Sequence, residues 1–272
     1  MTSLNAESLK KQLSGKMIGH HLLYYDEIGS TNDEAFRLGE KGAPEGMVLI
    51  AESQSSGKGR MQRIWYSPPG ANIYTSVILR PPVGTLQSTQ IPIAAGVAAA
   101  ETVNDFCPGR AWIKWPNDVL IGGKKVCGIL AQIKMSGQAV DFVVVGIGIN
   151  VNLAREQFPH DIQEIATSLA IEAGREISRP ELIIRLYENM AKWYRELTRN
   201  GFTAVRERWL SLSEMIGKTI SVKFHNEAVS GKAVGLDEDG SLILLTANNQ
   251  NMTVSAGDAT ILKEVNTYAT GN

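Results

Sequence analysis

The stretch at residues 54–65 reads QSSGKGRMQRIW, and it concentrates glycine, positive charge and an aromatic ring in one short segment. Gly57 and Gly59 permit backbone angles that other residues resist, so main-chain N–H groups can approach an anion closely. A basic loop that ends in an aromatic ring is typical of a site for a phosphorylated, planar ligand such as a nucleotide. The side chains expected to face this ligand are Lys58, Arg60, Arg63 and Trp65.

The alternative for this loop is a solvated surface cluster, because short basic motifs are weak signals on their own. The loop is not a P-loop. That motif requires Ser or Thr after its Gly-Lys pair and a glycine five positions earlier, whereas Gly59 follows Lys58 and Glu52 holds the early position. The rest of the chain has to decide between a surface cluster and a binding site.

The segments around the loop alternate between strand and helix patterns. Residues 140–150 form a strongly apolar run that fits the buried centre of a sheet. Its glycines at 146 and 148 allow the close approach of a neighbour or a ligand. A further short helix is expected at 162–172. The patterns predict an α+β fold, a mixed sheet packed with helices, from strands at 21–28, 47–52, 73–79 and 111–116 and helices at 31–40, 87–106 and 178–200.

The sequence pattern changes at Gly217, where apolar and polar residues begin to alternate. Turn signals at 237–240 and 247–250 divide the remainder into short segments, which predicts a small all-β module of about five strands. We therefore expect two domains, a larger one at 1–213 and a β domain at 214–272.

Composition narrows the function classes. The chain has 272 residues, of which 43% are hydrophobic and 20% charged, as in ordinary globular proteins. With 27 basic and 28 acidic residues the net charge is −1, so no general basic field exists to hold nucleic acid. This balance disfavours a dedicated DNA-binding protein.

Cysteine, histidine and hydropathy patterns give no positive signal. Cys107 and Cys127 form neither a metal motif nor a disulfide framework, and the four histidines lack ligand spacing, so no metal-ligating residues are assigned. Cys127 lies among apolar residues and reads as a buried core thiol. No apolar run reaches membrane-spanning length and no signal-peptide core is evident, so a cytoplasmic protein with no membrane partner is expected.

Three more polar clusters follow apolar strands or begin a helix, as binding residues on a rigid sheet often do. Each has a plain structural explanation: Thr31 and Glu34 fit a helix capping box, Asp118 fits a turn, and Lys125 fits an exposed hairpin. Their joint appearance favours a site. The three clusters are residues 30–32, 117–118 and 125–128.

In sequence order these segments resemble the motifs of the biotin protein ligases. The matching runs are GSTN at 29–32, GKGRMQRIW at 57–65, KWPND at 114–118, KVCGI at 125–129 and GIGIN at 146–150. The resemblance covers nearly the whole chain. It implies a mixed-sheet catalytic domain of the class II aminoacyl-tRNA synthetase and biotin protein ligase type, followed by a small C-terminal SH3-like β-barrel.

The resemblance implies a two-step reaction. Biotin is first activated with ATP to biotinyl-5′-AMP, with Mg²⁺ on the phosphates, and biotin is then transferred to a specific lysine of a biotin carboxyl carrier protein. It implies an enzyme with no nucleic-acid partner, and it allows a homodimer.

The same resemblance assigns site residues. Catalytic roles fall to Lys125, Arg60 and Asp118. Biotin contacts fall to Ser30, Thr31, Asn32, Gln54, Lys58, Gly59, Arg60, Lys125 and Gly128. Nucleotide contacts fall to Gly57, Lys58, Arg60, Arg63, Trp65 and Asn150.

The chain departs from the family pattern at one loop position. Lys58 stands where the family usually has arginine, so the charge is kept and the planar fork is lost, which predicts altered retention of the adenylate. Residues 1–29 are too few for the N-terminal winged-helix domain of some members, so ligase activity without repression is expected. Two alternatives stay open: a lipoate ligase or octanoyl transferase of the same fold, and a biotin-responsive DNA-binding regulator, which is disfavoured.

Overall fold

The computed structural model describes residues 4–82, 89–137, 139–224 and 227–262. Within these ranges no helix is both long and apolar enough to cross a membrane. The larger part of the chain contains α1 (Ala6–Leu13), β1 (Leu22–Ile28), α2 (Thr31–Glu40), β2 (Val48–Gln54), η1 (Arg60–Gln62), β3 (Ile73–Leu79), α4 (Ile91–Phe106), β4 (Ala111–Lys114), β5 (Asp118–Ile121), β6 (Lys124–Ser136), β7 (Ala139–Ile149), η2 (Arg155–Gln157), α5 (Leu169–Ala173), α6 (Arg179–Asn200) and α7 (Thr203–Ser211).

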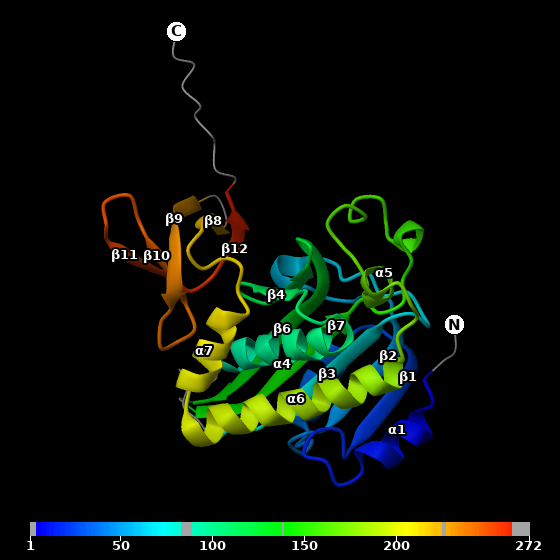
Figure 1. Cartoon of the computed structure of the whole chain (residues 1–272). Helices are drawn as coiled ribbons and strands as arrows, with labels where there is room; N and C mark the ends of the chain where they lie inside the picture. The colour runs from blue at the N-terminus through cyan, green and yellow to red at the C-terminus, as the bar shows by residue number, and fades with distance from the viewer. Residues whose placement is uncertain (1–3, 83–88, 138, 225–226, 263–272) are drawn as a thin grey trace.

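Seven strands form a mixed sheet in the order β1-β2-β3-β7-β6-β5-β4. β1 and β2 are parallel, and the other neighbouring strands are antiparallel. β7 occupies the centre, which confirms the prediction from its apolar sequence. α4 and α6 cover one face of the sheet and α2 covers part of the other (Figure 1).

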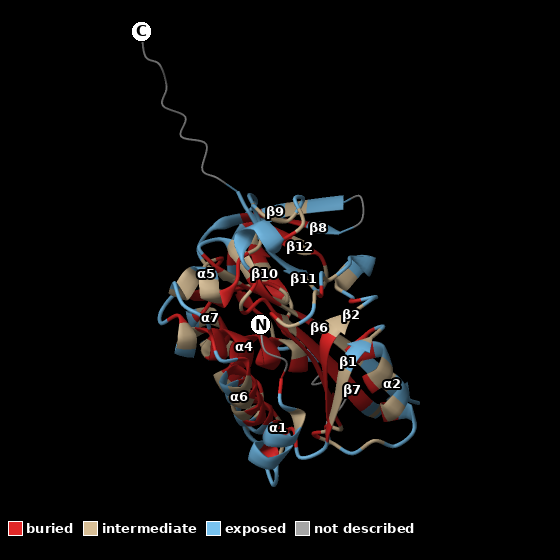
Figure 2. Cartoon of the chain, turned by 90° about the vertical axis from the view of Figure 1, so that its right-hand side faces the viewer, coloured by how far each residue is buried: buried red, intermediate tan, exposed pale blue. Residues whose placement is uncertain are grey.

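Alternation along β7 explains how both faces are filled. Val143, Val145 and Ile147 join the large core under α4 and α6, which Figure 2 shows as the main buried region. Phe142 and Val144 point the other way and pack under α2. The next two positions on the α2 face are Gly146 and Gly148, which have no side chains. The surface of the sheet is therefore not filled by β7 side chains beyond the N-terminus of α2.

The C-terminal module is a five-stranded antiparallel sheet in the order β11-β10-β9-β8-β12. The prediction of about five short strands is confirmed. The module packs beside α4 and β4: the Trp115 indole donates to the Gly240 carbonyl at 3.2 Å, and Gln90 donates to the Glu238 carbonyl (Figure 1). Its strands are β8 (Thr219–Phe224), β9 (Glu227–Leu236), β10 (Leu242–Leu245), β11 (Asn251–Val254) and β12 (Asp258–Ile261).

The prediction of a helix at 162–172 is wrong, because the observed helix α5 spans only Leu169–Ala173. The preceding residues pair with β6 instead. The Lys125 N–H donates to the Ile165 carbonyl at 2.8 Å, and the Thr167 N–H donates to the Lys125 carbonyl at 2.9 Å. Groups bonded across to a strand cannot also make helical bonds, so this segment lies along the end of β6.

Two other local predictions are also corrected. The predicted helix at 87–106 begins at Ile91 as a regular helix, and positions 87–88 lie outside the described residues. The predicted capping box is absent, since Ser30 is the N-cap of α2 and makes no capping bond. The Thr31 hydroxyl lies 3.1 Å from the Gln54 amide oxygen instead, so it belongs to the site rather than to the cap.

A buried ion pair joins β2 to α6. Arg179 Nη1 lies 2.8 Å from Glu52 Oε2, and the two side chains are only 4% and 7% exposed. The Leu4 N–H and the Tyr24 hydroxyl also donate to this carboxylate. Burial by itself raises the pKa of Glu52, but the bonds from Arg179 and the other donors outweigh it and hold that pKa below its usual value.

We predict that Arg179→Met lowers the free energy of unfolding by about 3–5 kcal/mol at neutral pH, because it leaves a buried carboxylate without its cation. In the native protein the pKa of Glu52 is depressed, so its stabilisation is present above its unfolded pKa and is lost as the pH falls through the folded value. In the variant the pH dependence has the opposite sign: lowering the pH stabilises the protein, because protonation of Glu52 removes the unpaired buried charge.

Urea unfolding at pH 7.5 and pH 5 measures this effect. The loss in the variant should shrink at the lower pH. Arg155→Met is the control, since Arg155 forms an exposed ion pair with Glu164 and its removal should leave the unfolding midpoint unchanged. Equal losses for the two variants would contradict a special role for the buried pair.

Candidate active site

A cavity of about 420 Å³ opens on the α2 face of the sheet, where β6 and β7 carry glycines. The structure brings all four predicted clusters to its wall, and each predicted site residue except Gly57 lines it. Gly57 lies at the base of the loop instead, where an added Cβ would come within 2.5 Å of the Trp65 carbonyl oxygen. The cavity size is that of an ordinary small-molecule site.

The loop at 54–65 closes on itself through backbone hydrogen bonds. The Trp65 N–H donates to the Gly57 carbonyl at 2.9 Å, and the Gly59 N–H donates to the Arg63 carbonyl at 2.8 Å. Between these bonds, Met61 and Gln62 adopt positive φ angles of 53° and 61° and turn the chain. The loop is thereby folded over the cavity, with its cations on the rim.

The Trp65 ring lies against the backbone of β6 and β7. Gly128 and Gly148 are cross-strand partners, and a Cβ on either would meet the ring, at 2.9 Å and 2.5 Å respectively. A Cβ on Gly146 would lie 1.9 Å from Asn32 Oδ1. The prediction that the β7 glycines allow a close approach is confirmed.

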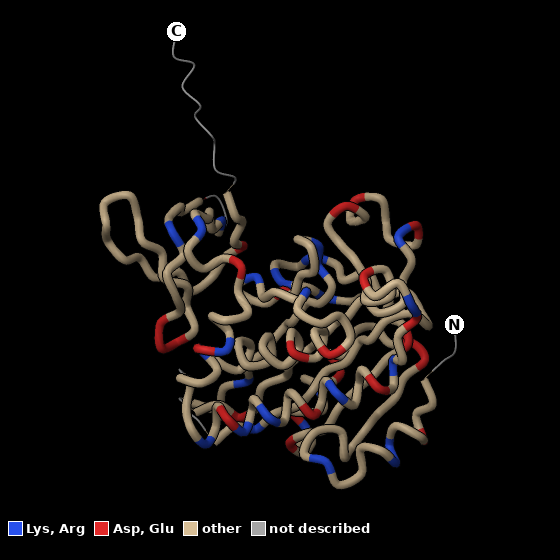
Figure 3. Tube along the Cα trace, viewed as in Figure 1, with Lys and Arg blue, Asp and Glu red and all other residues tan. Residues whose placement is uncertain are grey.

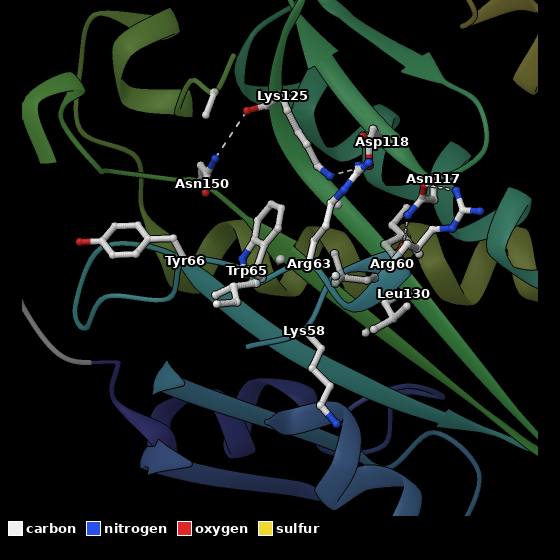
Figure 4. A pocket seen from close by; sticks show the side chains of 18 of the residues that line it. Lys58, Arg60, Arg63, Trp65, Tyr66, Asn117, Asp118, Lys125, Leu130 and Asn150 are labelled. Carbon is white, nitrogen blue, oxygen red and sulfur yellow. Dashed lines mark hydrogen bonds and ion pairs between the residues drawn. The ribbon is translucent and has the colours of Figure 1, made fainter. Parts of the chain in front are cut away.

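Lys125 and Asp118 form an ion pair inside the cavity. Lys125 Nζ lies 2.7 Å from Asp118 Oδ1 and 5.2 Å from the centroid of the Trp65 ring (Figure 4). The two side chains are 33% and 21% exposed, so the pair is partly shielded from water. The adjacent Cys127 is fully buried and burial raises its pKa, which agrees with a core thiol rather than a nucleophile.

The two loop arginines contact the C-terminal module. Arg60 donates to the Asn117 side chain at 3.3 Å and to the Gly257 carbonyl at 3.2 Å. Arg63 Nη2 lies 2.5 Å from Asp258 Oδ2 on β12. Burial lowers the pKa of Arg60, although a guanidinium stays charged at neutral pH. β12 therefore supplies part of the cavity wall, which the sequence did not indicate.

Lys58 differs from the other cations of the loop. Its ammonium pairs with Asp33 in the first turn of α2 at 2.6 Å, and Figure 4 shows it directed away from Lys125. The pair is about half exposed, with side chains 49% and 47% accessible. Lys58 thus lines the cavity while its charge ties the loop to α2.

Polar side chains from α2, β2 and the loop form a separate part of the wall. The Thr31 N–H donates to Gln54 Oε1 at 2.9 Å, and Gln54 Nε2 donates to the Ser67 hydroxyl at 3.1 Å. No bond to a described residue engages the Ser30 hydroxyl, which lines the cavity. The Asn32 amide is already committed, because it donates to the Leu130 carbonyl at 3.1 Å.

Asn150 connects the end of β7 to the segment that follows it. Its amide nitrogen donates to the Thr167 carbonyl at 3.1 Å, and its backbone N–H donates to the Val126 carbonyl at 2.9 Å. This holds an apolar wall over the cavity that sequence reasoning missed, because it placed residues 162–172 in a helix. That wall comprises Phe158, Ile162, Ile165 and Ala166.

The site combines a cation cluster and a polar amide-and-hydroxyl subsite in one half-enclosed cavity. Figure 3 shows acidic and basic residues interspersed along the rest of the trace. Among the described residues, no group of three or more His, Cys, Asp or Glu side chains is placed to hold a metal ion. The arrangement can hold an anion beside a neutral polar group.

Comparison with known proteins identifies the class. Residues 25–150 match the model of the Biotin/lipoate A/B protein ligase family, and residues 215–261 match that of the Biotin protein ligase C terminal domain. The bifunctional ligase/repressor BirA of Bacillus subtilis is 37% identical over 243 residues, which is 89% of this chain and 75% of that protein.

Two further relatives agree. The biotin–[acetyl-CoA-carboxylase] ligase of Paracoccus denitrificans is 35% identical over 79% of this chain and 90% of its own length. The biotin protein ligase of Aquifex aeolicus, solved in complex with biotin and ATP, superposes with a TM-score of 0.76 at 28% identity, covering 89% of this chain and 99% of that one. The chain belongs to the biotin protein ligase family.

We predict that Gly148→Ala displaces the Trp65 ring and destabilises the protein by about 1–3 kcal/mol, because the new Cβ would overlap the indole. The indole N–H resonance of Trp65 and the urea midpoint report the two effects. Gly96→Ala in α4 is the control, since its Cβ would meet only ordinary contacts from 3.9 Å. An unchanged Trp65 resonance in Gly148→Ala would contradict the contact.

Proposed function

We propose that this protein activates biotin with ATP to biotinyl-5′-AMP and transfers biotin to a lysine of a biotin carboxyl carrier protein. The observation that carries the proposal is the shared wall of one cavity, where Lys125 and Arg60 lie together with the polar groups of Thr31 and Gln54. A ligand with a neutral polar head and a carboxylate needs both kinds of wall. Family membership and the Aquifex aeolicus complex with biotin and ATP support it.

In the first step the biotin carboxylate attacks the α-phosphorus of ATP, a P–O bond forms and pyrophosphate leaves. Both reactants are anions, so cations must bring them together and stabilise the charge that grows on the α-phosphate. Lys125 is our candidate for contact with both groups, and Arg60 for the phosphates. The 2.7 Å pair with Asp118 would orient Lys125 for this role.

The head of biotin is assigned to the polar part of the wall. Ser30, Thr31 and Gln54 would hydrogen-bond the ureido group, and the backbones of Gly59 and Gly128 would border the ligand. We revise the role expected for Asn32, whose amide is bonded to β6 and connects to the Thr31 hydroxyl only through Ser76. A buried polar subsite of this kind rejects ligands that lack the matching group, which favours biotin over lipoate.

The nucleotide is assigned to the loop and the apolar wall. Trp65 would stack on adenine, Arg63 would reach the phosphates, and Asn150 would act by holding the segment with Ile165 over the base. Gly57 would act indirectly, by allowing the loop to close. Mg²⁺ would arrive with ATP, held mainly by phosphate oxygens and water.

In the second step the neutral amine of the carrier lysine attacks the biotinyl carbonyl. A C–N bond forms, the mixed anhydride C–O bond breaks and AMP leaves. Asp118 is our candidate acceptor for the proton that the amine gives up. The apolar wall and the folded loop would keep water from hydrolysing the anhydride.

We also propose the domain boundary at 213/214, supported by the family match that begins at residue 215. Cytoplasmic location, a homodimer and the absence of a nucleic-acid partner stay predictions.

The direct test mixes the protein with ATP, biotin and a carrier domain and follows biotin on the carrier by blotting. Lys125→Ala should lower the rate of biotin-dependent ATP–pyrophosphate exchange by about 10²–10³-fold, the cost of removing one preorganised charge from an anionic transition state. Lys124→Ala, which removes the neighbouring lysine outside the cavity wall, is the control. Normal exchange by Lys125→Ala would overturn the assignment, and no transfer by the wild type would overturn the function.

We predict that Asp258→Asn lowers the KM for ATP by about 2–5-fold and leaves the KM for biotin unchanged. Asp258 pairs with Arg63 and lies 3.9 Å from Arg60, so it competes with phosphate for both cations, and partly exposed pairs contribute about 0.2–1 kcal/mol. Asp239→Asn makes the same charge change elsewhere in the β module and should have no effect. A raised KM for ATP would show that Asp258 holds the arginines in their working position.

A further inference from the structure

A hydrogen-bond network lies behind the polar part of the cavity. At its centre is Ser76 on β3, which is fully buried and does not line the cavity. Its hydroxyl oxygen lies 2.6 Å from Asn32 Oδ1 and 2.8 Å from Thr31 Oγ1. Ser76 therefore touches two residues of the site without reaching a ligand.

The chemistry of the partners fixes the direction of each bond. The Leu130 carbonyl can only accept, so the Asn32 amide nitrogen, 3.1 Å away, must face it. The amide oxygen of Asn32 then faces Ser76 and has no proton to give. The single hydroxyl proton of Ser76 is consequently donated to Asn32.

This leaves only lone pairs on Ser76 for Thr31. A contact of 2.8 Å between two hydroxyl oxygens requires a proton, so Thr31 donates its own proton to Ser76. The second acceptor within reach of that proton is Gln54 Oε1 at a longer 3.1 Å, since this oxygen takes the Thr31 backbone N–H at 2.9 Å on one lone pair and keeps the other. Thr31 thus offers the cavity lone pairs and no proton.

The orientation of Gln54 follows by the same reasoning. Its Oε1 is held by the Thr31 N–H, so Nε2 faces the Ser67 hydroxyl, which itself donates to the Trp65 carbonyl at 2.8 Å. One Nε2 proton goes to Ser67, and the second remains for a ligand. The wall then presents an acceptor at Thr31 and a donor at Gln54, which matches an N–H group beside a carbonyl.

We propose that Ser76 is a specificity-determining positioning residue, which holds the Thr31 hydroxyl as an acceptor so that the cavity selects a ligand N–H at this point. The proposal rests on the proposed function and deepens it. A ligand with an acceptor at the same place would have to pull the Thr31 proton away from Ser76, leaving two sets of lone pairs facing each other in a buried network. Without Ser76 only the longer 3.1 Å contact with Gln54 Oε1 holds the Thr31 proton, so the obstacle is smaller.

The test compares biotin with its two cyclic carbamate analogues, in each of which a ring oxygen replaces one ureido N–H. Dissociation constants are measured by calorimetry without ATP for the wild type and for Ser76→Ala. The wild type should bind one of the two analogues at least about 100-fold more weakly than biotin, and Ser76→Ala should narrow that ratio about 10-fold. The narrowing should come from tighter binding of the analogue.

Controls separate this role from a structural one. Thr102→Val removes another buried hydroxyl, in α4 and outside the cavity wall, and should leave the ratio unchanged. If Ser76→Ala does not fold, Ser76→Cys keeps the volume with a weaker donor and should shift the ratio in the same direction. Equal weakening of all ligands in both Ser76 variants would overturn the proposal while leaving the proposed function intact. Failure of the wild type to bind biotin would overturn both.

Discussion

The site depends on the loss of side chains along one face of the central strand. Phe142 and Val144 fill the space under α2, and the next two positions on that face are Gly146 and Gly148. At these two glycines the side chains of Asn32 and Trp65 pack directly against the backbone of β7. The cavity is therefore a consequence of where glycine falls in an otherwise apolar strand, and the remaining groups are arranged around that opening.

Elements distant in sequence complete the arrangement through polar contacts. The loop at 54–65 is fixed at its base by its own backbone, tied to α2 by Lys58 and Asp33, and held on the far side by Asp258. Its cations thus have defined partners within the chain. A binding anion must compete with carboxylates that already hold these cations, so charge is exchanged between partners and no bare charge has to be buried.

Sequence reasoning found the parts of the site that are local. The glycines, the loop cations and the Lys125 hairpin carry their chemistry in short motifs, and periodicity placed β7 at the sheet centre because a strand buried on both faces must be apolar. Sequence reasoning did not assign Ser76 to the site, because a small side chain within an apolar strand is expected to lie in the core. Asp258 could not be found either, since a four-residue strand in another module gives no sign of where it packs.

The helix misplaced at 162–172 shows the same limit. Its apolar residues fit a helix by composition, but pairing with Lys125 decided the outcome, and that pairing is a contact across about forty residues of chain. Local propensity is overridden wherever backbone groups find partners on a neighbouring strand. Here the override places the apolar wall over the cavity.

The contact between β12 and the loop joins segments that are synthesised at very different times. During synthesis the polar subsite and the cation loop emerge in the first quarter of the chain, while the carboxylate that pairs with Arg63 emerges only at residue 258. A nascent or prematurely ended chain therefore carries loop cations that lack this partner. Completion of β12 brings these cations into the arrangement seen in the finished molecule.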